Sequence, residues 1–231
     1  EVFRFQSENN QVYKSFIKYL GIDPDAVCRV VDIPFLPVSF FKKHKVVSGV
    51  HSRYLVFESS GTSGKTTSRH YVTDAGLYEE SFLRTFTMFY GSPSEYMIAA
   101  LLPSYTERGN SSLIYMVDRL IKQSRCQSSG FYRENINDLL SDIAAARAGK
   151  WKVLLIGVSF ALLDLSEKYS PDLSGVIVME TGGMKGRRKE MIREELHNTL
   201  NGAFGTKVIH SEYGMTELMS QAWSQGEGLF R

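Results

Sequence analysis

Apolar and polar residues alternate along the chain in blocks that predict strands and helices in turn. Short apolar runs typical of strands occur at 54–58, 69–72, 96–102, 152–158, 175–180 and 206–209. Apolar residues at spacings of three or four predict helices over 73–89, 111–121, 134–148, 160–168 and 187–201. Strands that alternate with helices predict an α/β fold, with mostly parallel sheets flanked by helices.

The chain before residue 50 shows a different pattern. Residues 8–20 carry apolar side chains at helical spacing and end at Gly21, which predicts one helix. Residues 32–41 contain two prolines and end in a pair of phenylalanines, so we expect extended chain that packs over a core. The sequence thus predicts a helical and proline-containing lead-in over residues 1–50 and an alternating α/β core over 51–231.

The composition is that of a globular protein and excludes several classes. Hydrophobic residues make up 43% of the 231 residues, which is enough for a sizeable buried core. The formal net charge of +2 lacks the basic excess of nucleic-acid-binding proteins, so we expect no nucleic-acid partner. The apolar runs are too short to span a bilayer and no secretory signal opens the chain, so we expect a cytoplasmic protein without a membrane span. Cys28 and Cys126 have no metal-like spacing, and we expect two free thiols.

Three polar, glycine-containing segments follow predicted strands and carry the chemistry that a nucleotide needs. The first, Ser59-Ser60-Gly61-Thr62-Ser63-Gly64-Lys65, offers hydroxyls, a cation and the backbone N–H groups that glycines expose, which suits phosphates. The second contains Gly182-Gly183-Met184, where the backbone can approach a flat base. The third, His210-Ser211-Glu212-Tyr213-Gly214-Met215-Thr216-Glu217, offers a ring for stacking, a hydroxyl for a phosphate and a carboxylate for Mg²⁺. If the preceding strands share one sheet, the segments converge on one crevice, although each alone is also compatible with an ordinary turn.

The first segment is also close to the phosphate-binding loop of P-loop NTPases and kinases. Gly64-Lys65-Thr66 matches the end of the pattern G-x-x-x-x-G-K-[ST], but Ser59 stands where the pattern has its first glycine. A P-loop opens directly into a helix, whereas residues 67–73 contain three β-branched side chains and make a poor helix start. A P-loop NTPase or kinase therefore stays as an alternative.

The order of the three segments is similar to that of a known superfamily. Ser59–Lys65 resembles the Ser/Thr/Gly signature of adenylate-forming, or acyl-activating, enzymes, and Gly182-Gly183 resembles their adenine-side glycine pair. Tyr213-Gly214-Met215-Thr216-Glu217 matches their Y-G-x-T-E motif. Residues 32–42 and 103–113 resemble the acyl-protein synthetases (long-chain-fatty-acid–protein ligases) of bacterial bioluminescence operons. The resemblance extends over essentially the whole chain and implies the N-terminal core of the adenylate-forming fold.

This resemblance implies ATP- and Mg²⁺-dependent activation of a carboxylic acid, by the narrower likeness a fatty acid, to an acyl-adenylate. The acyl group then passes to a thiol of the enzyme, of a partner acyl reductase or carrier protein, or of coenzyme A. The implied catalytic residues are Thr216, which bonds the α-phosphate, and Glu217, which holds Mg²⁺. The acid is expected near Tyr105 and His210. The residues implied to contact ATP are Ser59, Ser60, Gly61, Thr62, Ser63, Gly64, Lys65, Gly182, Gly183, Met184, Glu212, Tyr213, Gly214, Met215 and Thr216.

The sequence departs from the family's pattern at two points. Thr66-Thr67 stand where many members continue with Pro-Lys, so the cation that helps the triphosphate is not settled. Family members also continue to a ribose-binding aspartate, a hinge and a small C-terminal lid domain with a catalytic lysine. We therefore expect an incomplete large N-terminal domain that binds ATP weakly and adenylates poorly. A non-catalytic acyl- or protein-binding module with the same fold is the second alternative.

Overall fold

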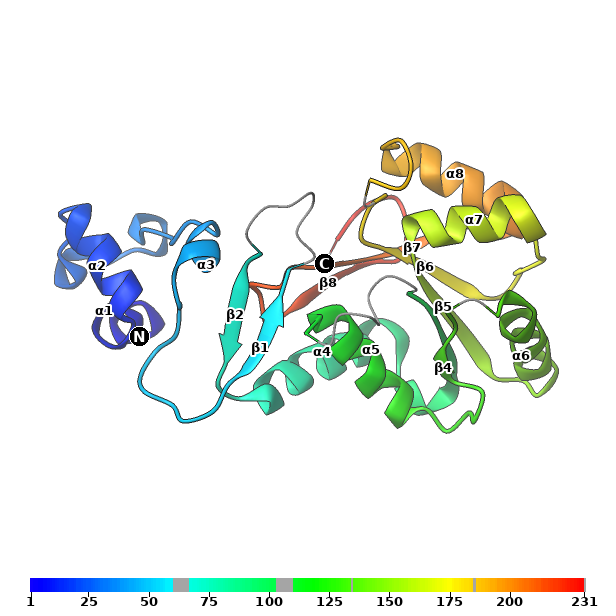
Figure 1. Cartoon of the computed structure of the whole chain (residues 1–231), viewed down its shortest axis with the longest axis horizontal. Helices are drawn as coiled ribbons and strands as arrows, with labels where there is room; N and C mark the ends of the chain where they lie inside the picture. The colour runs from blue at the N-terminus through cyan, green and yellow to red at the C-terminus, as the bar shows by residue number, and fades with distance from the viewer. Residues whose placement is uncertain (60–66, 103–109, 134, 185, 231) are drawn as a thin grey trace. The chain divides into compact units, whose positions relative to one another are not determined.

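The computed structural model describes residues 1–59, 67–102, 110–133, 135–184 and 186–230. They form two compact units, Glu1–Leu77 and Tyr78–Arg231, and each is described by itself (Figure 1). The first unit therefore contains the predicted lead-in together with the first two strands of the chain.

Short helices make up the first part of unit one. They are α1 (Val2–Asn9), α2 (Gln11–Tyr19), two 3-10 helices (Pro24–Ala26 and Val30–Asp32) and α3 (Phe40–Lys43). The single helix expected over 8–20 is wrong, because Asn10 has extended backbone and its side chain caps α2. The Asn10 side-chain oxygen accepts a hydrogen bond from the Tyr13 N–H at 3.1 Å. The Tyr13 hydroxyl donates to the Pro34 carbonyl at 2.8 Å, which fastens the proline-containing stretch to α2.

Two strands of unit one form a sheet of their own. β1 (Leu55–Glu58) and β2 (Arg69–Val72) pair antiparallel, and neither joins the larger sheet. The condition that the strands before all three glycine-containing segments share one sheet is therefore not met for the first segment. Ten residues separate β1 from β2, and a parallel crossover needs about a dozen or more.

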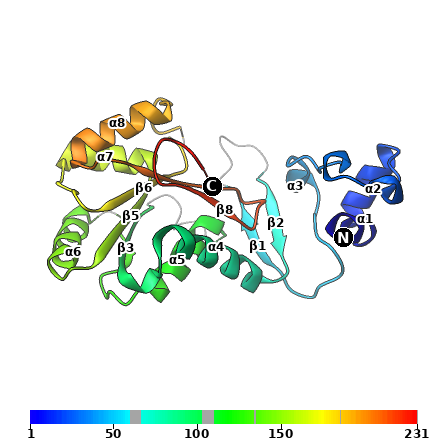
Figure 2. The ribbon, with the colours of Figure 1, turned by 180° about the vertical axis from the view of Figure 1, so that it is seen from behind.

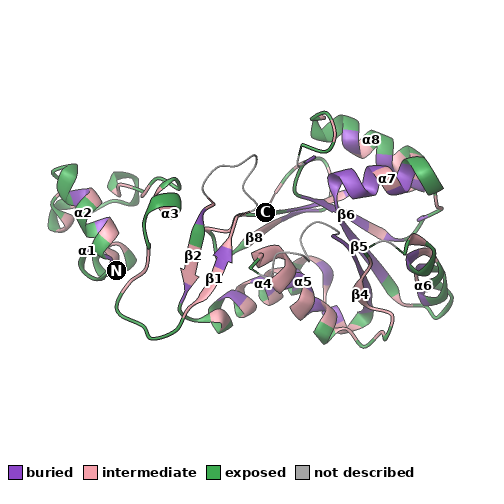
Figure 3. Ribbon diagram, viewed as in Figure 1, coloured by how far each residue is buried: buried purple, intermediate pink, exposed green. Residues whose placement is uncertain are grey.

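A six-stranded sheet forms the core of the second unit. Its strands are β3 (Tyr96–Leu101), β4 (Gly130–Phe131), β5 (Lys152–Val158), β6 (Ile177–Thr181), β7 (His210–Gly214) and β8 (Gln221–Ser224). The order is β4-β3-β5-β6-β7-β8, with parallel neighbours from β4 to β7 and β8 antiparallel to β7. The predicted α/β class with a mostly parallel sheet is confirmed. β3 is buried throughout and β5 is buried after its first residue, as expected for strands covered on both faces (Figure 3).

Helices cover both faces of this sheet. They are α4 (Ala75–Tyr90), α5 (Ser112–Gln123), α6 (Ile136–Ala148), α7 (Ser159–Tyr169) and α8 (Arg193–Phe204), with a short 3-10 turn at Pro93–Glu95. Figures 1 and 2 show α7 and α8 on one side of the sheet and α4 and α5 on the other. α4 buries an aromatic stripe with one residue in every four: Tyr78, Phe82, Phe86 and Tyr90. Leu77, directly before this stripe, is 60% exposed.

Two predicted boundaries near the end of the chain are wrong. The strand expected over 206–209 begins at His210, and the helix expected over 187–201 begins at Arg193. Both free thiols are confirmed, since Cys28 and Cys126 form no disulfide. Among the described residues, no helix has the length and apolar character that crossing a membrane requires.

Candidate functional site

Two of the predicted segments lie at neighbouring strand ends in the second unit. β6 and β7 are parallel, with Glu180 paired with Ser211 and Thr181 paired with Glu212. Gly182-Gly183, which follows β6, therefore lies beside Tyr213-Gly214 at the end of β7. Ligands of parallel α/β sheets bind at this carboxyl edge, so the register brings the second and third segments to a suitable place.

The glycine pair gives this edge an exposed backbone. Gly182 has φ 73°, in the left-handed region that glycine adopts without strain. Both glycines are exposed, whereas Met184 is 2% exposed and anchors the segment in the core. A Cβ on Gly183 would meet nothing nearer than Glu190 Oε2 at 3.9 Å. The segment thus leaves open space along its backbone, as a flat ligand needs.

Tyr213 supplies an aromatic surface beside the glycine pair. The residue is 50% exposed, and its side chain points to the opposite face of the sheet from Glu212, because neighbouring residues of a strand alternate. The Tyr213 and Phe230 ring centroids are 6.0 Å apart in an edge-on arrangement. The Arg193 guanidinium lies 4.9 Å from the Phe230 centroid. Two rings and one cation therefore gather on the α8 side of the strand end.

Glu212 is a buried carboxyl on the other face of β7. It is 5% exposed, and the Thr181 hydroxyl of the neighbouring strand hydrogen-bonds to its Oε2. Burial raises the pKa of Glu212 to about 7, with a smaller contribution from the charge of Glu180, against the lowering effect of the Thr181 bond. The carboxyl of Glu212, a residue expected to contact ATP, ties the ends of β6 and β7 together. A Cβ on Gly214 would lie 2.8 Å from Glu212 Oε1, so a larger residue there would displace this carboxyl.

Glu180 is a second buried carboxyl, on the face covered by α7 and α8. Its Oε1 lies 3.1 Å from Arg193 Nε and 3.6 Å from His197 Nε2, and its Oε2 accepts from the Ser159 hydroxyl at 3.3 Å. Burial by itself would raise the pKa of Glu180, but hydrogen bonds from His197 and Ser211 and the charge of Arg193 outweigh it. The pKa of Glu180 therefore lies below its usual value, and the group is ionised at neutral pH.

Thr216 and Glu217 stand in the connection between β7 and β8. The Leu218 N–H donates to the Met215 carbonyl at 3.0 Å and closes a turn, so these residues do not begin a helix. No group of three or more His, Cys, Asp or Glu side chains capable of holding a metal occurs within the described residues. Mg²⁺ usually takes one or two carboxylates together with substrate phosphates and water, so a single carboxylate such as Glu217 fits a nucleotide-bound magnesium ion.

The remaining predicted residues lie elsewhere or outside the described chain. His210 is the first residue of β7, about 10 Å along the strand from Tyr213, and its Nδ1 lies 3.2 Å from the Tyr90 hydroxyl. Burial, with a smaller effect of His197, lowers the pKa of His210. Ser59 follows β1 in the first unit, and its hydroxyl accepts from the Ser68 N–H at 2.9 Å. The predictions for Tyr105 and for residues 60–65 concern positions outside the described residues.

Several residues of this edge were not predicted from the sequence. Thr181 contacts the predicted residue Glu212, and Phe230 contacts the predicted residue Tyr213. Arg193 contacts Glu180 and the Phe230 ring, neither of which was predicted. One local signal was present, because Glu180 is a charged residue directly after an apolar strand run, and such residues are rarely buried without partners. No protein-family model matches the chain, and a search of curated proteins found no similar sequence.

Proposed function

We propose that the chain binds ATP at the carboxyl edge of β6 and β7 and activates a carboxylic acid, with fatty acids as the substrate class, as an acyl-adenylate. The sulfur of a protein or carrier thiol then forms a bond to the acyl carbon, the bond from that carbon to the phosphate oxygen breaks, and AMP leaves with the electron pair while the thiol loses its proton. One observation supports this most strongly: the pairing of β6 with β7 places an exposed glycine pair beside the half-exposed ring of Tyr213. A base can stack on that ring while its edge lies along the backbone of Gly182-Gly183.

The proposed reaction is a displacement at the α-phosphorus. A carboxylate oxygen of the acid forms a bond to that phosphorus, the bond to the bridging oxygen breaks, and pyrophosphate leaves with the electron pair. Such a step needs neutralised phosphate charge more than it needs a base. In this proposal the Thr216 hydroxyl donates to an α-phosphate oxygen, and Glu217 holds the Mg²⁺ that neutralises the phosphates.

The P-loop alternative is less well supported. A P-loop requires a helix directly after its lysine and hydroxyl residue, because the helix N-terminus binds the phosphates. Here β2 begins at Arg69, three residues after Thr66, and pairs antiparallel with β1.

The first test is ATP binding by the chain, measured by isothermal titration calorimetry in Mg²⁺. We expect Tyr213→Ala to lower the affinity for ATP at least tenfold, because the stacking surface is lost. Tyr213→Phe should bind ATP nearly as tightly as the wild type does. Leu218→Ala is the matched control, since Leu218 is 44% exposed in the same hairpin. If Lys65→Ala abolishes binding and Tyr213→Ala does not, the P-loop alternative is correct and the proposed site is wrong.

The second test concerns the reaction itself. Acid-dependent exchange of pyrophosphate into ATP is measured on the protein in its natural full length, with acids from acetate to hexadecanoate. We expect exchange with long-chain acids and its loss in Glu217→Ala. ATP binding without exchange for any acid would reject the enzyme and favour the non-catalytic binding module.

A further inference from the structure

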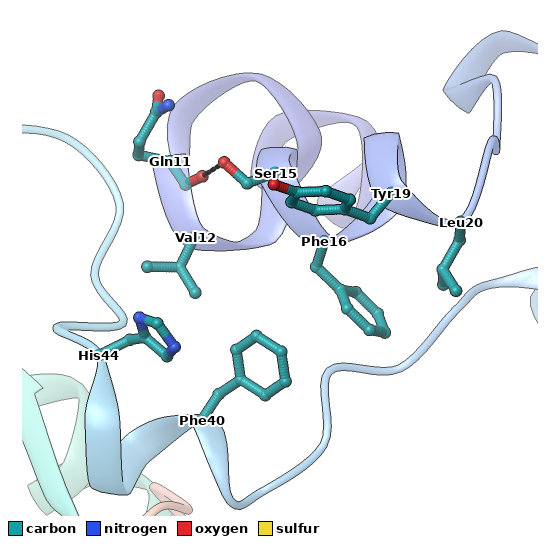
Figure 4. Close-up of a pocket in the computed structure, with 8 residues that line it drawn as sticks. All are labelled: Gln11, Val12, Ser15, Phe16, Tyr19, Leu20, Phe40 and His44. Atoms are coloured by element: carbon teal, nitrogen blue, oxygen red, sulfur yellow. Dashed lines mark hydrogen bonds between the residues drawn. The ribbon is translucent and has the colours of Figure 1, made fainter.

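An apolar groove lies within the first unit, between α2 and α3. It has a volume of about 530 Å³ and is lined by Gln11, Val12, Ser15, Phe16, Tyr19, Leu20, Phe40 and His44 (Figure 4). This volume is within the range of roughly 300–1,000 Å³ that small-molecule pockets occupy. The groove is open to solvent along one side of α2, where Tyr19 is 92% and Leu20 53% exposed. Apolar side chains this exposed have free energy to gain from a partner.

The two ends of the groove differ in chemistry. Figure 4 shows Gln11 and His44 at one end and Tyr19 and Leu20 at the other, with Phe16 and Phe40 between them. The Phe16 and Phe40 rings pack edge-on at 5.5 Å, and Phe40 packs on His44 at 5.2 Å, so the floor is continuous. The groove therefore runs from a polar end to an apolar end.

The polar end carries positive charge. His44 belongs to the run Lys42-Lys43-His44-Lys45, of which Lys42 and Lys43 are exposed at the end of α3. Neither of these two lysines takes part in a salt bridge within the described part of the chain. Lys45 lies 4.0 Å from the Tyr54 ring centroid and is engaged there. Lys42 and Lys43 do not line the groove, but they stand one and two residues before His44, so the chain carries two exposed cations next to the polar end.

We propose that this groove binds a free long-chain carboxylate, with the alkyl chain along Phe16 and Leu20 and the carboxylate at the His44 end. The lining residues of α2 extend from Gln11 to Leu20, about 14 Å at the helical rise. With carbon–carbon bonds of about 1.5 Å, an extended alkyl chain of about 12 carbons has that length. A docked protein helix or a bilayer would favour an apolar surface along the whole groove, whereas one polar and one apolar end match an amphiphile with a single charged head.

None of the groove's lining residues takes part in the proposed reaction, and all of them belong to the first unit. The test of the groove therefore needs no ATP. Dodecanoate below its micellar concentration is titrated into the chain by calorimetry, beside acetate and dodecyltrimethylammonium. We expect dodecanoate to bind, acetate not to bind, and the cationic amphiphile to bind at least tenfold more weakly than dodecanoate.

Variants at the two ends assign the binding to the groove. We expect Leu20→Glu to lower the affinity for dodecanoate at least tenfold. The double change Lys42→Glu with Lys43→Glu should lower that affinity severalfold. Val50→Glu is the matched control, since Val50 is 99% exposed in the same unit and does not line the groove. All four positions are exposed, so the variants should keep the wild-type circular dichroism spectrum and melting temperature.

Three results would overturn the proposal. Dodecanoate affinity that is unchanged in both groove variants would place the ligand elsewhere. A dimer that Leu20→Glu dissociates, with no dodecanoate binding by the monomer, would make a second copy the occupant. Sedimentation with phosphatidylcholine–phosphatidylglycerol vesicles that Leu20→Glu abolishes, without binding of monomeric dodecanoate, would make a bilayer the occupant.

Discussion

The buried carboxyl of Glu212 gives a prediction whose size and sign follow from the structure. Replacing it by glutamine keeps its shape and its hydrogen bond to Thr181 but removes the titrating proton. Because the pKa of Glu212 is about 7 in the folded chain and close to 4.5 when exposed, the folded state retains a proton that the unfolded state releases. We therefore expect Glu212→Gln to stabilise the protein at neutral and alkaline pH.

The pH window follows from these two values. Below about pH 4.5 Glu212 is protonated in both states and costs the fold nothing. As the pH rises from 4.5 to 7, the wild type loses about 1.4 kcal/mol of unfolding free energy per pH unit from this residue, and above 7 the loss levels off. The gap between the two pKa values corresponds to a total of about 3 kcal/mol.

Urea denaturation of wild type and Glu212→Gln at several pH values between 5 and 8.5 measures this effect. Other titrating groups are common to both proteins, so the difference in unfolding free energy isolates Glu212. We expect the advantage of Glu212→Gln to grow from pH 5 to 7 and then stay constant. A difference that does not change with pH would refute the reasoning, because it would mean that Glu212 ionises in the folded chain as it does in water.

Two further predictions test the packing around the same edge. Glu180→Gln should lower the unfolding free energy by about 1–3 kcal/mol at pH 7, since it leaves the Arg193 and His197 donors without an ionised partner. That loss should shrink below pH 4.5, as the lowered folded pKa of Glu180 is approached, and a loss that is equal at pH 7 and pH 3 would contradict it. Gly157→Ala should cost about 1–3 kcal/mol by urea denaturation, because its Cβ would lie 2.8 Å from buried Leu162 atoms, whereas Gly130→Ala, with nothing within 4 Å, serves as the control. Equal unfolding free energies for the two glycine variants in urea would contradict this prediction, because they would show that the sheet relaxes around the added methyl group.

The parallel sheet could be predicted from the sequence because the residues of each of its central strands form a recognisable local pattern. β3 and β5 are buried on both faces, so they appear as continuous apolar runs that no surface segment would carry. The start of the helix expected over 111–121 also depends on local residues, since the Ser111 side chain accepts from the N–H of Ile114, three residues away, and caps α5. The break at Asn10 had the same kind of local signal, and the asparagine could have been taken as a cap.

β7 could not be placed correctly from local pattern. Its residues His210, Ser211 and Glu212 are polar, so they were taken for a loop after a strand ending at Ile209. They can lie in a buried strand because each has a hydrogen-bonding partner: Tyr90 for His210, His197 for Ser211 and Thr181 for Glu212. These partners are distant in sequence, so a local pattern does not reveal them. Those partners come from α4, α8 and β6, and only the fold brings them together.

These buried polar contacts also bear on how the proposed nucleotide edge works. Ionised carboxylates at the strand ends would repel an anionic ligand that binds at this edge. Burial keeps Glu212 mostly protonated near pH 6, below its pKa of about 7, and the ionised Glu180 is paired with Arg193. Below pH 7 the two carboxyls therefore hold the ends of β6 and β7 in register with little repulsion of phosphates. By this reasoning Glu212→Gln should leave ATP affinity unchanged near pH 6, whereas above pH 7, where wild-type Glu212 ionises, the glutamine variant should bind ATP more tightly than wild type.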